Sequence, residues 1–126
     1  MKVGDKMYKS YDIALEFIGS PEDIMEKVIL LLDPEFESIV DMTEFLIRLN
    51  IEPPKEGIKI CGDGEYLDCI DELIFTIEID KKEDEMPALD FIYDIYKKIY
   101  NKIGEFKDME VNLIIRVSHG DHNEGE

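Results

Sequence analysis

Cysteine, basic residues and long apolar runs are all scarce in this sequence of 126 residues. Its two cysteines, Cys61 and Cys69, are too few for a disulfide framework, so we expect reduced thiols. The longest apolar run, residues 28–32, is far below the roughly 20 residues that a membrane-spanning helix needs. The N-terminal segment contains lysines but no apolar stretch typical of a secretory signal. These absences predict a cytoplasmic protein with no membrane partner.

The shortage of basic residues leaves a strongly negative chain. Fourteen Lys and Arg residues face 31 Asp and Glu residues, for a net charge of −17. Such a chain repels nucleic acid and anionic membranes, so we expect no direct DNA or RNA binding. The carboxylates are also clustered, with ten between Asp63 and Glu85 and six between Asp33 and Glu52. Two clusters whose fields add exceed what solubility requires, and they favour a basic protein partner.

Catalytic signatures are missing as well. The sequence holds no Ser-His-Asp set, no Cys-His pair, no Gly-rich phosphate loop and no basic aromatic patch. A restriction-type nuclease would place two metal-binding carboxylates and a lysine near a strand, and Asp71, Asp80 and Lys82 match that pattern loosely. The pattern is short, and a chain at −17 would repel its own substrate. We therefore predict a protein that is not an enzyme and needs no cofactor.

Two places in the sequence carry side chains that can bind a metal ion. The stretch "GDGEYLDCIDE" offers oxygen ligands suited to calcium, but its spacing departs from that of an EF-hand loop. On a strand Glu65 and Asp68 would also point to opposite faces, so a solvated turn is the better interpretation and calcium binding stays undecided. In the tail, His119 and His122 are too few for a closed zinc site. We predict no metal ligands.

Regular patterns predict four strands and three helices. Apolar residues alternate along residues 11–18, 73–80 and 109–117, and "GIKIC" is typical of a short strand that leads into a hairpin turn at "GDGE". Residues 36–40 are a further short-strand candidate. One main helix begins at the N-cap Ser20 and carries an apolar stripe that Met25 widens, and the other runs from Pro87 to a C-cap at Gly104. A shorter helix follows the N-cap Thr43.

This order of elements predicts an α+β fold. Strands with one apolar and one polar face, together with two main amphipathic helices, favour a two-layer sandwich with an antiparallel-rich sheet, ferredoxin-like or a variant of it. We expect a single domain over residues 1–118 and a disordered polar tail over residues 119–126. The oligomeric state is left open.

Two segments resemble small acidic bacterial immunity proteins of toxin/immunity systems. They are "MTEFLIRLNIEPPKEGIKICGDG", residues 42–64, and "ALDFIYDIYKKIYNKIGEFKDMEVNLIIRV", residues 88–117. Together they cover about half of the chain, which departs from those proteins by an additional helix near residues 20–32 and by the absence of tryptophan. The resemblance implies a protein that neutralises a cognate toxin by binding it.

The sequence therefore predicts a non-enzymatic immunity protein that binds a basic, nuclease-type toxin through an acidic surface. The alternative is a phage-type DNA mimic that inhibits a restriction or CRISPR defence protein. The expected partner-binding residues are carboxylates near the proposed hairpin, with Tyr66 as the aromatic anchor among them: Asp63, Glu65, Tyr66, Asp68, Asp71 and Glu72.

Overall fold

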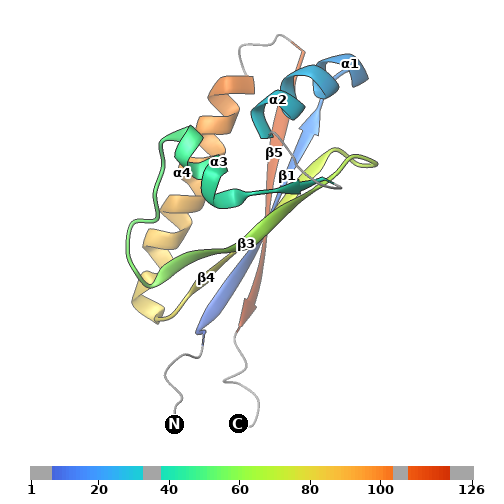
Figure 1. The fold of residues 1–126 in the computed structure, drawn as a ribbon. Helices are drawn as coiled ribbons and strands as arrows, with labels where there is room; N and C mark the ends of the chain where they lie inside the picture. Colours follow the sequence, from blue (N-terminus) through green and yellow to red (C-terminus); the bar gives the residue numbers. More distant parts are fainter. Residues whose placement is uncertain (1–6, 33–37, 104–107, 120–126) are drawn as a thin grey trace.

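Five strands and a set of helical segments make up the fold (Figure 1). The computed structural model of the protein describes residues 7–32, 38–103 and 108–119. In chain order the elements are β1 (Lys9–Ile18), α1 (Pro21–Asp23), η1 (Ile24–Val28), α2 (Ile29–Leu32), β2 (Ile39–Val40), α3 (Met42–Leu49), β3 (Ile58–Leu67), β4 (Glu72–Ile79), η2 (Lys82–Asp84), α4 (Glu85–Ile103) and β5 (Glu110–His119). None of the described helices combines the length and the apolar composition needed to cross a membrane.

The sheet has the strand order β2-β3-β4-β1-β5, and every neighbouring pair is antiparallel. Without the two-residue β2, the chain follows the β-α-β-β-α-β connectivity of a ferredoxin-like fold, with β4 inserted between β1 and β3. The strand β2 is then an addition at one edge. This topology confirms the predicted α+β sandwich.

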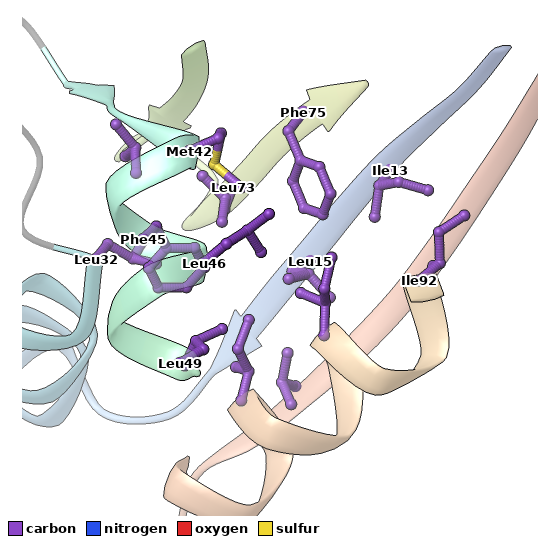
Figure 2. Close-up of a cluster of buried hydrophobic side chains, with 14 of the residues drawn as sticks. Ile13, Leu15, Leu32, Met42, Phe45, Leu46, Leu49, Leu73, Phe75 and Ile92 are labelled. Carbon is purple, nitrogen blue, oxygen red and sulfur yellow. The ribbon is translucent and has the colours of Figure 1, made fainter. Parts of the chain in front are cut away.

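The described helices all lie on one face of the sheet, which we call the helix face (Figure 1). Alternate residues of β1 and β4 point into this layer and are buried, among them Ile13, Leu15, Leu73 and Phe75. Figure 2 shows Leu73 beside Met42 of α3 and Ile13 on the side of Ile92, a residue of α4. The opposite face, which we call the open face, is covered by none of the described helices. The open face is therefore available to a partner over much of β1, β3, β4 and β5 as far as the described residues go.

The helical segment after β1 begins where the sequence predicts. The backbone N–H of Asp23 donates to Ser20 Oγ at 3.1 Å, and Pro21 occupies the first helical position. The segment then widens into a π-helix over Ile24–Val28. Ile24, Val28 and Leu32 are spaced four residues apart along this segment and are buried. Met25, expected within the apolar stripe, is 69 % exposed, so that part of the prediction is wrong.

The predicted hairpin turn at "GDGE" is also wrong. β3 continues through these residues, and its register against β4 shifts between Cys61 and Glu65, which marks a β-bulge. Gly62 supplies the positive φ of 50° that the irregularity needs. The turn that joins β3 to β4 instead spans residues 68–71, where Asp71 has a φ of 51°.

Two helix starts differ from expectation. Asp41, rather than Thr43, caps α3, because its Oδ1 accepts the N–H of Glu44 at 3.1 Å. α4 begins at Glu85, two residues before Pro87, and follows a 3₁₀ turn.

The 3₁₀ turn before α4 holds a buried carboxylate. Asp84 is 1 % exposed and accepts a charge-assisted hydrogen bond from Lys55 Nζ at 2.6 Å. The ion pair ties the loop before β3 to the start of α4.

Some expectations fall outside the described residues. These are the C-cap at Gly104, the first two residues of the strand expected at 36–40, and residues 120–126 of the expected tail. His119, expected in that tail, is the last residue of β5.

Candidate functional site on the open face of the sheet

The open face brings carboxylates from three strands together. By register, Glu16 on β1 lies directly opposite Glu72 on β4, and Glu65 on β3 lies diagonally across from Glu72. We call Glu65, Glu72 and Glu16 the acidic row. Residues directly opposite in an antiparallel pair have Cβ atoms about 5 Å apart, and diagonal neighbours lie within about 8 Å. Three negative charges therefore cross the sheet within a short distance.

The acidic row lacks compensating charge. Among the described residues, no ion pair involves Glu65, Glu72 or Glu16. The one polar contact is Asn112 on β5, whose Nδ2 donates to Glu16 Oε1 at 3.4 Å. Like charges directly opposite on a sheet destabilise it, typically by a few tenths of a kcal/mol or more. The fold thus carries a small electrostatic cost at this place.

An apolar strip runs beside the acidic row. Ile74, Ala14 and Ile114 lie side by side on β4, β1 and β5. Because Ala14 is short, the strip is hollowed, and the hollow measures about 80 Å³. Asp12, Glu72 and Arg116 help to line it. The open face therefore offers an apolar recess bordered by charge.

Acidic residues dominate this face among the described residues. By register they number six, against two basic residues, and all eight are Asp12, Glu16, Glu65, Glu72, Glu78, Glu110, Lys59 and Arg116. Lys59 lies opposite Glu78, and Arg116 lies opposite Asp12. Both cations thus belong to other cross-strand rows, and the acidic row stands without one.

The structure divides the five sequence-predicted carboxylates among three places. Glu65 and Glu72 belong to the acidic row, whereas Asp63 is exposed at the bulge of β3. Asp68 and Asp71 lie in the turn between β3 and β4. The turn and the acidic row share one end of the sheet, so four of the five lie on adjoining surfaces.

Tyr66 is the exception. Its ring is only 3 % exposed and belongs to the core, so it cannot offer its face to a partner as expected. Its hydroxyl donates to Asp71 Oδ1 at 2.9 Å, and burial followed by this hydrogen bond raises the pKa of Tyr66. Tyr66 instead positions Asp71 at the turn.

A second hollow adjoins the turn, and it measures about 480 Å³. Ile24, Met25 and Ile29 supply its apolar wall, and Asp68 and Asp71 supply its carboxylates. Met25 projects from the π-helix and takes the place expected of Tyr66 as an exposed apolar side chain near the acidic residues. Sequence reasoning missed Met25 and Glu16, because one depends on the π-turn and the other on strand register.

The nuclease-like arrangement does not form. Asp71 and Asp80 flank opposite ends of β4, which places them roughly 30 Å apart at about 3.3 Å per strand residue. Two carboxylates at that separation cannot hold one metal ion. Within the described residues, no group of three or more His, Cys, Asp and Glu side chains is arranged to bind a metal.

The two thiols occupy different environments. Cys61 is half-buried on the open face just before the bulge, and burial followed by a hydrogen bond with Glu78 raises its pKa to about 12. Cys69 is exposed in the turn. A reactive cysteine needs accessible thiolate, so Cys61 is a poor nucleophile.

Comparisons with protein-family models, with curated proteins and with solved structures found no match to this chain. The resemblance to immunity proteins therefore stays a prediction, and the geometry of the open face carries the functional proposal.

Proposed function

We propose that this protein is a non-enzymatic immunity protein that neutralises a basic toxin domain, of the nuclease type, by binding it with the open face. The observation that carries the proposal is the acidic row, in which Glu16 and Glu72 face each other without a cation. An Arg or Lys side chain of a partner placed between them would relieve their repulsion. It would also form charge-assisted hydrogen bonds, which are about twice as strong as neutral ones.

The surroundings of the acidic row suit a protein partner. The recess over Ala14 accepts a small apolar group, and the exposed Met25 beside the turn offers a flexible apolar contact. Interfaces of high affinity combine such apolar anchors with charges that speed association. The net charge of −17 steers a basic partner toward the chain.

The DNA-mimic alternative predicts a different surface. A cleft shaped for duplex DNA reads phosphates and gains little from an apolar strip between carboxylates. The strip formed by Ile74, Ala14 and Ile114 therefore favours a partner whose surface matches this chain in particular.

Affinity co-purification tests the proposal. The tagged protein is bound to the cell extract of its source organism and washed at low and at high salt, and the retained proteins are identified by mass spectrometry. We expect one basic protein that survives the high-salt wash and that stops growth when it is expressed alone. Co-expression of the wild-type chain should restore growth.

A matched pair of charge-reversal variants locates the surface. Glu16→Lys with Glu72→Lys should lose the partner, whereas Glu52→Lys with Glu56→Lys changes the charge equally at exposed positions away from the acidic row and should retain it. Equal retention by both variants would remove the open face from the proposal. A retained restriction or CRISPR enzyme, in place of a toxin, would establish the DNA-mimic alternative.

A further inference from the structure

Among the described residues, no strand pairs with the outer edge of β5. The N–H of Phe17 donates to the carbonyl of Asp71 at the β4 side, so odd-numbered residues of β1 direct their backbone groups toward β4 and even-numbered residues direct them toward β5. The register of β1 with β5 then leaves the odd-numbered residues of β5 facing outward. The hydroxyl of Tyr96 donates to the carbonyl of Val111 at 3.3 Å, which agrees with this assignment.

Apolar side chains accompany this edge on the helix face. Val117 is 51 % exposed, and Ile115 beside it is also exposed. Along α4, the rings of Tyr93, Tyr96 and Tyr100 follow one another with centroids 6.1 and 5.8 Å apart, and Tyr96 contacts β5. Tyr93 and Tyr100 are exposed, and the half-buried Tyr96 between them connects this tyrosine stripe to the strand edge.

The same region is nearly neutral. Residues 85–119, which hold α4 and β5, contain six acidic and five basic residues, in a chain whose net charge is −17. Two copies of the chain repel each other over most of their surfaces, and that repulsion is weakest where α4 and β5 lie. Charge thus selects this edge for contact between identical chains.

We propose that two copies of the protein pair through β5, antiparallel and about a two-fold axis at Leu113. Outward-facing residues then meet outward-facing residues, with Leu113 opposite Leu113 of the second copy and Val111 opposite Ile115 of the second copy. The two five-stranded sheets join into one continuous sheet. This inference goes beyond the proposed function and does not depend on it.

Charge complementarity within β5 favours this register. With Leu113 at the centre, Glu110 of each copy lies opposite Arg116 of the other. Both are exposed, and both lie at positions of the closer, non-hydrogen-bonded kind. Moving the axis one or two residues toward the C-terminus places Arg116 opposite Asn112 or Ile114 instead. The carbonyl of Val111 has a second lone pair for the new strand, since Tyr96 takes only one.

Sedimentation velocity of the full chain over a concentration series tests the pairing, with no partner protein present. We expect a dimer for the wild type. Arg116→Glu should weaken dimerisation roughly tenfold or more, because both symmetric pairs become repulsive, and Glu110→Arg with Arg116→Glu should restore it. Ile47→Lys, at an exposed apolar position on α3, is the control and should leave the dimer intact.

The register has a separate test. In a background of Cys61→Ser and Cys69→Ser, Leu113→Cys should form a cross-linked dimer on oxidation, because directly opposed residues lie within disulfide reach. Ile115→Cys should not, because its opposite residue is Val111 of the second copy. A wild-type chain that stays monomeric, or a cross-link at residue 115 and not at 113, would overturn the proposal.

Discussion

The two edges of the sheet are built in opposite ways. At one edge, β2 pairs with β3 over only two residues, and β3 is interrupted by a bulge near Gly62 and exposes Asp63 and Glu65. At the other edge, β5 pairs with β1 over ten residues without a register shift. Bulges, short strands and charge protect an edge from pairing with another chain, whereas a long regular apolar edge invites it. The β2–β3 edge, which we call the guarded edge, is therefore protected from pairing with another chain. The β5 edge, which we call the open edge, is not.

Charge follows the same division. Residues 1–84 contain 22 acidic and nine basic residues, whereas residues 85–119, which hold α4 and β5, contain six acidic and five basic residues. The carboxylates gather on the β3–β4 side and on the open face, where a basic partner is proposed to bind. A joined pair of sheets would place two such open faces on one continuous surface, so the proposed assembly would use one edge and the proposed recognition would use the other region.

The largest expected effect is the difference in unfolding free energy between proline substitutions at the inner and outer sides of β5. Ile114→Pro removes an N–H that pairs with β1, and it should lower the free energy of unfolding by about 3 kcal/mol or more. Ile115→Pro removes an outward N–H, which edge strands tolerate, and should cost far less while abolishing the dimer. Urea denaturation at dilute concentrations measures both, and equal destabilisation would refute the assignment of outward-facing groups.

A smaller effect is expected at the guarded edge. Gly64→Ala places a Cβ 2.7 Å from Met42 Sδ and 3.2 Å from the carbonyl of Ile74, so it should destabilise the fold by about 1–3 kcal/mol. Gly62→Ala meets open space but must adopt a φ of 50°, which costs about 1 kcal/mol. Thermal unfolding compares the two, and Gly62→Asn, which tolerates this conformation better, is the control.

Removing a charge from the acidic row should stabilise the fold, whereas the glycine substitutions should destabilise it. Glu72→Gln removes the repulsion between Glu72 and Glu16, so it should stabilise the fold by about 0.5 kcal/mol while weakening the binding of a basic partner. Glu78→Gln is the matched control, because Glu78 lies opposite Lys59 and gains nothing from losing its charge. If both variants unfold at the same denaturant concentration, the repulsion between Glu72 and Glu16 does not measurably destabilise the fold.

Local patterns were enough to predict the sandwich, because alternation along β1 and β4 and the capping at Ser20 depend on neighbouring residues. The bulge was not predictable in the same way, since Asp-Gly sequences occur both in turns and in bulges, and pairing with β4 decides between them. The misplaced turn also caused the error at Tyr66. In a continuous β3, Tyr66 falls on the same side as Ile58 and Ile60, which face the helices.

The candidate site depended even more on long-range structure. The sequence places Glu16 on the polar side of its strand, but only the register of β1 with β4 sets it against Glu72. Met25 lies in a π-helical turn that no residue pattern predicts, and its side chain is exposed. Composition therefore predicted the acidic character of the surface, and topology determined which carboxylates meet.

The alkylation rates of the two thiols report how often the guarded edge opens, and the expected effect is the smallest of the four. Cys69 is exposed and should be alkylated first, whereas Cys61 should react slowly at pH 8 because its pKa is raised to about 12.

The raised pKa of Cys61 also makes the stability of the fold depend on pH. Protonation of Cys61 favours the folded state below the ordinary pKa of 9.0, and this contribution is lost as the pH rises toward 12. Mass mapping of alkylated peptides follows both thiols, and Gly64→Ala should speed the labelling of Cys61 by opening the bulge, with Cys69 unchanged. Equal rates for the two thiols in the wild type would mean that the bulged edge opens freely, and the contrast between a guarded and an open edge would then fail.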